Sequence, residues 1–152
     1  MKFVRFQQLK EQALALCREE GRPLPDPDRM NPVVLALIGD SVFTFYVRMR
    51  LLAVSSHVQV IHVIAARMVS AVMQAKAMHV LESGLTGSES EIVHRGRNAK
   101  SMVPKSATVS EYRAATAFEA LCGWLLLKDQ EDRLELIMEQ AFRIISEEMK
   151  NN

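Results

Sequence analysis

Apolar residues recur along most of this chain at the three- and four-residue spacing that places them on one face of an α-helix. This pattern predicts helices over about residues 3–20, 31–52, 58–81, 108–128 and 134–149, with a short helix ending near Gly96. No segment shows the alternation of apolar and polar residues that is typical of a half-buried strand. The sequence therefore predicts an all-α fold.

Turn and cap residues divide the chain near its start. Gly21 is a natural helix stop, and the proline-rich stretch 22–28 favours an extended connector because proline lacks the amide donor that a helix needs. Asn31, followed by proline, is a typical N-cap for the next helix. We expect an N-terminal helix and Pro-rich connector over 1–30 and the main domain over 31–152, forming a single compact domain overall.

Three Ser/Thr-x-x-Glu patterns mark further helix starts. Two of them overlap, beginning at Thr86 and Ser88, and either can form the capping box of the short helix. The third begins at Thr108. The intervening residues 98–107 are polar and lack an apolar period, so they are predicted to form an exposed basic loop.

The charges are unevenly distributed although the net charge is only +1. Residues 92–113 are predominantly basic, and residues 129–150 are predominantly acidic. The side chains in the basic region that are candidates for contacting phosphate groups are Arg95, Arg97, Asn98, Lys100, Ser101 and Lys105. The alternative is an ordinary cluster of solvated charges with no ligand.

The cysteines and the apolar segments of the sequence indicate in which cellular compartment the protein is expected. Cys17 and Cys122 stand alone, without the spacing of a zinc site or a disulfide framework. The N-terminus lacks the apolar region of a secretory signal. Charged residues interrupt the most apolar stretch well before the length of a membrane span. We expect a cytoplasmic protein with no membrane partner.

Two carboxylates are isolated on apolar helices. Asp40 is the only acid between residues 31 and 81, and Glu119 is the only charged residue between 114 and 127. An unpaired ionised carboxylate in a core costs several kcal/mol, so each should find a partner, become protonated or bind a cation. If the two helices cross here, both acids suit Mg²⁺, which commonly takes one or two protein carboxylates and several waters.

The residues leave structural alternatives open for both acids. Asp40 follows Gly39 and would also serve as the cap of a helix that starts at Ser41. Glu119 would also be accommodated by an ion pair with a distant arginine. Isolation alone does not decide between these roles and a metal site.

Two segments resemble motifs of ribonuclease III. Residues 37–42, Leu-Ile-Gly-Asp-Ser-Val, resemble its Leu-Gly-Asp-Ser-Val signature, and residues 116–121, Thr-Ala-Phe-Glu-Ala-Leu, resemble its second acidic motif. Similarity to the Mini-III relatives, which lack a separate double-stranded RNA-binding domain, extends through residues 31–52, 69–75, 95–105 and 112–113. The resemblance covers roughly residues 31–134.

The resemblance implies a ribonuclease III-like endonuclease domain that forms a two-fold homodimer. It implies hydrolysis of double-stranded RNA, in particular precursor large-subunit ribosomal RNA, to 5′-phosphate and 3′-hydroxyl ends. Asp40 is carried over as the catalytic, metal-binding aspartate and Glu119 as the second catalytic, metal-binding carboxylate. Mg²⁺ is the implied cofactor, with Mn²⁺ as a substitute.

The chain also departs from the family patterns. Ala36 and Thr116 stand where full-length ribonuclease III has further acids, a reduction that Mini-III enzymes share. Thr44, His94, Ser106 and Thr108 also differ from residues common among Mini-III relatives. An alternative function is therefore a catalytically weak or inactive helical protein that only binds double-stranded RNA, and a third is a structural partner protein. Retention of both lone acids argues against the first of these, and the second would leave the lone acids and the basic loop unexplained.

Apolar residues cover more than one face of the helix predicted over 31–52. A second subunit is one way to bury the extra face. The alternative is a monomer in which the final helix, 134–149, covers it.

Overall fold

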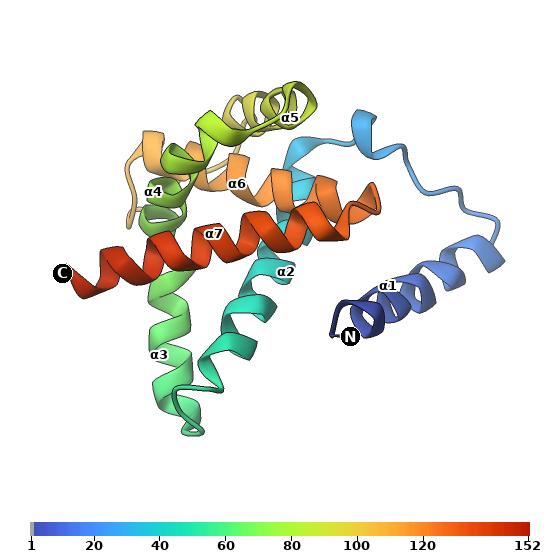
Figure 1. Ribbon diagram of the computed structural model, residues 1–152. Helices are drawn as coiled ribbons and strands as arrows, with labels where there is room; N and C mark the ends of the chain where they lie inside the picture. Colours follow the sequence, from blue (N-terminus) through green and yellow to red (C-terminus); the bar gives the residue numbers. More distant parts are fainter. Residues whose placement is uncertain (1) are drawn as a thin grey trace. The chain divides into compact units, whose positions relative to one another are not determined.

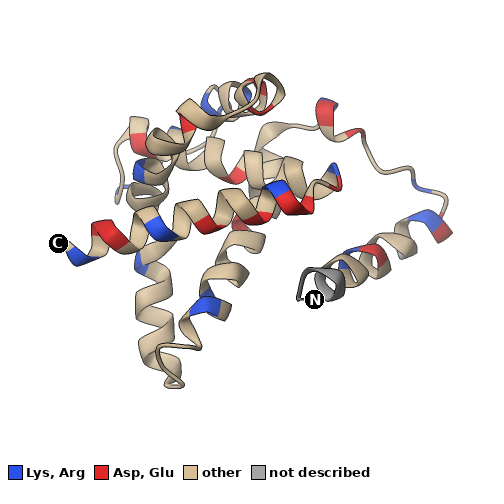
Figure 2. Ribbon diagram, in the orientation of Figure 1, with Lys and Arg blue, Asp and Glu red and all other residues tan. Residues whose placement is uncertain are grey.

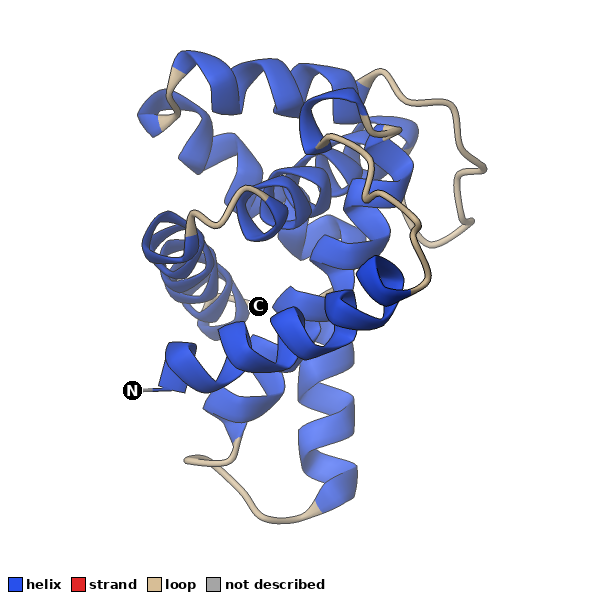
Figure 3. Cartoon of the chain, turned by 90° about the vertical axis from the view of Figure 1, so that its right-hand side faces the viewer, coloured by secondary structure: helices blue, strands red, loops and turns tan. Residues whose placement is uncertain are grey.

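The computed structural model describes residues 2–152, with the side chains of 2–6 and 16 outside the description. The chain is helical, and no strand occurs in the described range (Figure 1, Figure 3). The α-helices are α1 Lys2–Glu19, α2 Pro32–Leu51, α3 Val58–Met68, α4 Ala71–Leu81, α5 Gly87–Arg97, α6 Val109–Leu127 and α7 Glu131–Lys150. Short 3₁₀ turns lie at η1 Pro27–Arg29 and η2 Glu82–Gly84. The predicted all-α fold is confirmed.

The chain divides into two units between Met30 and Asn31. In the first unit, α1 ends before Gly21, which adopts a left-handed φ of 68°. A non-glycine side chain would strain the backbone there. The connector that follows is mostly irregular, except for η1, where the Asp26 side chain accepts a hydrogen bond from the Asp28 amide.

In the second unit, α6 forms the centre of the core and packs against α2, α4, α5 and α7. Every residue from 115 to 126 is buried except Glu119, which is partly exposed. The predicted caps hold: Asn31 caps α2, and capping boxes at Thr86 and Thr108 start α5 and α6. Residues 98–106 form the expected loop, exposed at nearly every position.

The helix predicted over 58–81 is wrong in one respect, because the chain bends at Ser70. There α3 ends and α4 begins, and α3 makes an angle of 52° with the α4–η2 segment. The Ser70 side chain accepts a hydrogen bond from the Met73 amide and so caps α4. Apolar periodicity continues through this cap and concealed the break. The bend sets the course of α4, which packs against α6.

Helices α2 and α6 cross at very close range because each contributes a glycine. A Cβ at Gly39 would overlap the backbone carbonyl of Glu119, and a Cβ at Gly123 would overlap the carbonyl of Leu35. Neither backbone can retreat without separating the two helices. On α2 the crossing point is Gly39, the residue before Asp40. On α6 the crossing point includes Glu119 itself.

Helix α2 is long and apolar enough to cross a membrane by length and composition, as core helices of soluble proteins also are. Here one side of α2 is buried within the domain, through Leu35, Phe43 and Val47 among others. Phe43 packs edge-on against Phe118 of α6, with 4.9 Å between the ring centroids. The other side of α2 remains exposed.

Candidate active site

Asp40 lies in the middle of α2, and this excludes the cap alternative, because the helix begins eight residues earlier at Pro32. Its carboxylate is partly buried, and Thr44, one helical turn later, donates a hydrogen bond from Oγ1 to Asp40 Oδ1 at 3.4 Å. Thr44 is one of the departures from the family pattern. In this chain it orients the aspartate without adding charge.

Glu119 lies on α6 where this helix meets α2. Its pKa is raised from the ordinary 4.5 to about 7, first by burial and then by the negative charge of Asp40, while a contact with the Gln74 side chain opposes the rise. Within the described part of the chain no lysine or arginine pairs with Glu119. The distant-arginine alternative therefore finds no partner there.

The two predicted carboxylates are thus brought together at the α2–α6 crossing, and neither forms an ion pair with a lysine or arginine among the described residues. No cluster of three or more His, Cys, Asp or Glu side chains suited to a metal occurs in the described range. A cation at this crossing must therefore complete its ligands with neutral oxygens, from protein amides, water or substrate. Mg²⁺ has this preference.

Gln74 provides a structural test of whether this site fits a hydrated cation. It lies on α4 and is completely buried, and its Oε1 is the buried side-chain atom without a hydrogen-bond partner among the described residues. Gln74 adds a neutral side-chain oxygen next to the Glu119 carboxylate, and oxygen ligands fit a hard divalent ion. Sequence reasoning missed Gln74 as a site residue. The available signal was an amide at a core position of an apolar helix.

The candidate RNA-contacting residues do not form a single loop. Arg95 and Arg97 lie on the last turn of α5, and Asn98 is its C-cap. The Arg97 guanidinium pairs with Glu82, so part of its role is structural. Asn98 Nδ2 lies 3.0 Å from His94 Nε2. Lys100, Ser101 and Lys105 are exposed in the loop as predicted.

Helix α5 connects this basic segment to the carboxylates. Gly96 packs against α6 so closely that a Cβ there would lie 2.8 Å from Ala117 Cα. Ala117 is two residues before Glu119. The basic end of α5 is thereby fixed next to the part of α6 that carries the acid.

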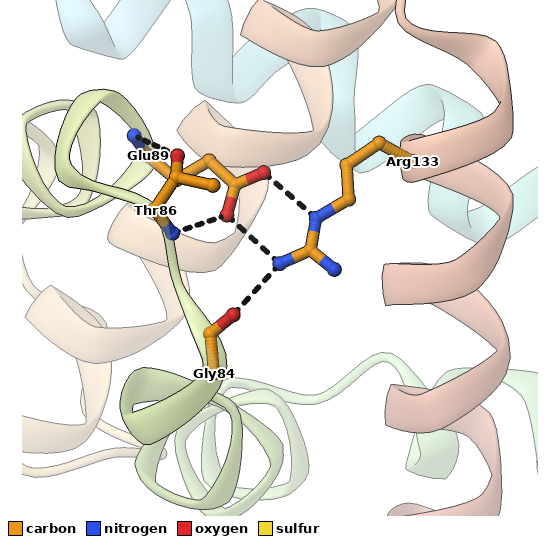
Figure 4. Close-up of polar contacts among 4 residues, drawn as sticks. All are labelled: Gly84, Thr86, Glu89 and Arg133. Carbon is orange, nitrogen blue, oxygen red and sulfur yellow. Dashed lines mark hydrogen bonds and ion pairs between the residues drawn. The ribbon is translucent and has the colours of Figure 1, made fainter.

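The N-terminal end of α5 is held by a different glutamate. Glu89 accepts hydrogen bonds from Arg133 Nε at 2.7 Å and from Arg133 Nη2 at 2.9 Å, and also from the Thr86 amide (Figure 4). Arg133, on α7, also donates to the Gly84 carbonyl. This paired glutamate fastens α5 and the turn before it to α7.

Comparison with known proteins shows which family this helical domain and its two carboxylates belong to. The ribonuclease III domain family matches residues 33–130, which include Asp40 and Glu119. The Mini-ribonuclease 3 of Brevibacillus brevis is 43% identical over 125 residues, covering 81% of this chain and 93% of that protein. The Mini-ribonuclease 3 of Staphylococcus aureus is 37% identical over 122 residues, covering 78% and 91%.

A solved structure has the same fold. The crystal structure of a protein from Fusobacterium nucleatum superposes with a TM-score of 0.72 at 25% identity, covering 76% of this chain and 96% of that one. Fold, crossing carboxylates and sequence therefore define a helical phosphodiester hydrolase. The chain belongs to the ribonuclease III family, in its Mini-ribonuclease 3 group, and is an endoribonuclease.

Proposed function

We propose that this chain cleaves double-stranded RNA with Asp40 and Glu119 as the catalytic, cation-binding pair. The observation that supports this most directly is the meeting of the two carboxylates at the α2–α6 crossing, with no lysine or arginine paired to Glu119 among the described residues. Keeping two like charges together in a partly buried site is unfavourable. A bound divalent cation removes that cost.

The residues around the pair prepare it to bind Mg²⁺, with Mn²⁺ as a substitute. When bound, the cation supplies positive charge that lowers the pKa of water and stabilises negative charge on the scissile phosphate. Thr44 holds the Asp40 carboxylate in place. The raised pKa of Glu119 means that the cation competes with a proton there. Asp40 and Glu119 are the residues that would hold the cation.

Substrate contact is assigned to the basic end of α5 and the loop after it. Duplex RNA has a deep, narrow major groove that side chains cannot read, so recognition rests on phosphates and 2′-hydroxyls. Lys100, Ser101 and Lys105 are exposed to make such contacts. The product ends would be 5′-phosphate and 3′-hydroxyl, and precursor large-subunit ribosomal RNA in the cytoplasm is the proposed natural substrate.

A second copy of the chain is the proposed partner on the open side of α2. Apolar side chains remain exposed there, including Leu37 at 66% and Val34 at 44%, and Val58 and Val63 of α3 are also exposed. Figure 2 shows α3 almost free of charge. Helix α7 contacts α2 through Phe142 and Tyr46 but leaves these side chains exposed. Leu37 lies one turn before Asp40, so a two-fold dimer would bring two sites near one duplex.

The function is tested by incubating the full chain with long double-stranded RNA, single-stranded RNA and duplex DNA, in Mg²⁺ or in chelator. We expect cleavage of double-stranded RNA in Mg²⁺ alone, with products that accept ligation only through a 5′-phosphate. Binding without turnover would instead support a non-catalytic RNA-binding protein. Cleavage that persists in chelator would contradict the metal requirement.

The dimer is tested separately by sedimentation of a chain of 17.1 kDa, whose dimer is twice that mass. Replacing Leu37 by Glu should yield monomers and slow paired cuts on opposite strands. Val80→Glu is the matched control, because Val80 is similarly exposed but lies on α4 rather than on α2 or α3. A parent that sediments as a monomer while making paired cuts would contradict the dimer.

A further inference from the structure

Gln74 has a buried side-chain oxygen without a hydrogen-bond partner in the described part of the chain, and the packing around the residue does not explain why a polar side chain is there. Its side chain is 0% exposed, yet Oε1 has no hydrogen-bond partner among the described residues. Leaving a buried polar group unpaired costs about 1–3 kcal/mol. An apolar side chain of similar shape, such as methionine, would fill the same space without that cost. A polar group retained at such a position needs a partner other than the protein itself.

The orientation of the amide follows from its contacts. Gln74 Nε2 donates to the Val69 carbonyl at 3.0 Å, and the Gln74 side chain also lies close enough to the Glu119 carboxylate to lower its pKa. Both partners are oxygen acceptors, so the nitrogen must face them. Exchanging nitrogen and oxygen would place carbonyl against carbonyl. The contacts with Val69 and Glu119 therefore account for the amide nitrogen but leave the oxygen unexplained.

The position of Gln74 follows from the break at Ser70. Because α4 starts anew there, Gln74 lies on its first turn, next to the helix end that its nitrogen holds and against α6. Three side chains from three helices, Asp40, Gln74 and Glu119, therefore converge on one place. Two are acidic, and the third presents a neutral oxygen acceptor.

Resting on the proposed function, we propose that Gln74 is a positioning residue of the cation site. Its amide N–H orients the Glu119 carboxylate, and its Oε1 accepts a hydrogen bond from water carried by the divalent cation. Mg²⁺ retains several waters when it binds protein, and each water needs acceptors for its protons. A neutral buried oxygen meets that need without adding a third negative charge to the pair. Such supporting contacts commonly change metal affinity or activity by about 10–100-fold.

Two substitutions test the proposal with effects of opposite sign. Gln74→Met keeps the volume and removes the amide, so Mn²⁺ affinity, measured by titration of the full chain without RNA, should fall by about tenfold or more. In chelator, its thermal stability should remain close to that of the parent because the unpaired oxygen is also removed. Gln74→Glu places a further carboxylate oxygen at the site and should raise Mn²⁺ affinity. Gln140→Met, at an exposed position of α7, is the control for the same chemical change.

A kinetic measurement separates positioning from folding. With double-stranded RNA in Mg²⁺, Gln74→Met should lower kcat with little change in KM, because the substituted side chain is buried away from the basic loop. A parent that neither binds Mn²⁺ nor cleaves RNA would overturn the proposed function. The alternative is that the parent binds Mn²⁺ and cleaves RNA while Asp40→Asn does neither. If Gln74→Met and Gln74→Glu then bind Mn²⁺ as tightly as the parent, only the role of Gln74 is overturned. If Gln74→Met does not fold, Gln74→Glu alone decides by the direction of its affinity change.

Discussion

Two glutamates on neighbouring helices have opposite environments. Glu89 is 2% exposed and accepts hydrogen bonds from two nitrogens of the Arg133 guanidinium, Nε and Nη2, and this hydrogen bonding lowers its pKa. Glu119 is less buried, faces another acid, and has its pKa raised to about 7 by burial and by Asp40. The more buried glutamate is therefore the one held in its charged form.

The difference separates a structural carboxylate from a functional one. Arg133 and the Thr86 amide together give both carboxylate oxygens of Glu89 hydrogen-bond donors (Figure 4). Glu119 and Asp40 are left with a repulsion that only a proton or an added cation relieves. Burial alone does not identify a site. The identity of the neighbouring groups does.

The largest effect is expected where the two acids are brought together. Gly39→Ala would drive a Cβ into the Glu119 carbonyl, forcing α2 and α6 apart and lowering the free energy of unfolding by about 3 kcal/mol or more. Gly87→Ala is the control, because nothing lies within 4 Å of a Cβ at that position. Urea denaturation compares the two. A Gly39→Ala protein with parental stability would mean that the close crossing is not maintained in solution.

Breaking the satisfied pair should have the next largest effect. Glu89→Gln leaves Arg133 without its anion and weakens the start of α5, lowering the free energy of unfolding by about 3 kcal/mol at neutral pH. Because the pKa of Glu89 is lowered, this loss should shrink as pH falls and the parental carboxylate becomes protonated. Glu139→Gln, in an exposed pair with Arg143, should cost less than about 1 kcal/mol. Equal losses of unfolding free energy in Glu89→Gln and Glu139→Gln would contradict the greater structural importance of the Glu89–Arg133 pair.

Glu119 should respond to pH in the opposite direction. Its raised pKa means that the folded chain holds the proton more tightly than the unfolded chain does, so stability in chelator falls as pH rises from 4.5 to about 7. Glu119→Gln removes this penalty and should be more stable than the parent at pH ~8 by about 2–3 kcal/mol, with no gain near pH ~4.5. Denaturation curves of the parent and of Glu119→Gln at both pH values measure this difference in stability. A variant that is less stable at pH ~8 would indicate a partner for Glu119 that the structure does not contain.

The smallest effect on stability, with a clear effect on binding, is expected in the basic loop. Replacing Lys100 and Lys105 by Ala should leave folding unchanged, weaken binding to all duplex RNA sequences and reduce the salt slope by about one for each lost phosphate contact. Arg97→Ala is measured separately, because Arg97 also pairs with Glu82. Lys150→Ala, at the end of α7, is the control. An unchanged slope in the double variant would exclude this loop from the RNA contacts.

Local chemistry explains what could be predicted from sequence. The caps at Asn31, Thr86 and Thr108 depend on residues within three positions; the sequence predicts Asn31 and Thr108 and leaves Thr86 and Ser88 as alternatives, of which the structure has Thr86. Asp40 and Glu119 were recognisable as candidates because each is the lone acid on an apolar helix. Such isolation is visible in sequence, since it concerns only the neighbours along the same helix.

Long-range contacts explain what was missed. Glu89 and Glu111 both follow a threonine in the same capping pattern, yet Glu89 is buried because Arg133, 44 residues away, reaches it. The close approach of Gly39 to α6 likewise depends on a residue far along the chain. Gln74 is informative only because its oxygen lacks a partner in three dimensions. The spacing of residues along the sequence does not predict these contacts between distant parts of the chain.

The most direct test of the central claim is the rate of double-stranded RNA cleavage in Mg²⁺ by Asp40→Asn and Glu119→Gln, beside Glu89→Gln at a temperature where all three are folded. The first two variants should cleave at least about 100-fold more slowly than the parent while still binding RNA in chelator, because each loses charge that holds the cation. Glu89→Gln should cleave at nearly the parental rate. Cleavage by Asp40→Asn or Glu119→Gln within about tenfold of the parent would contradict the assignment of this pair as the catalytic site.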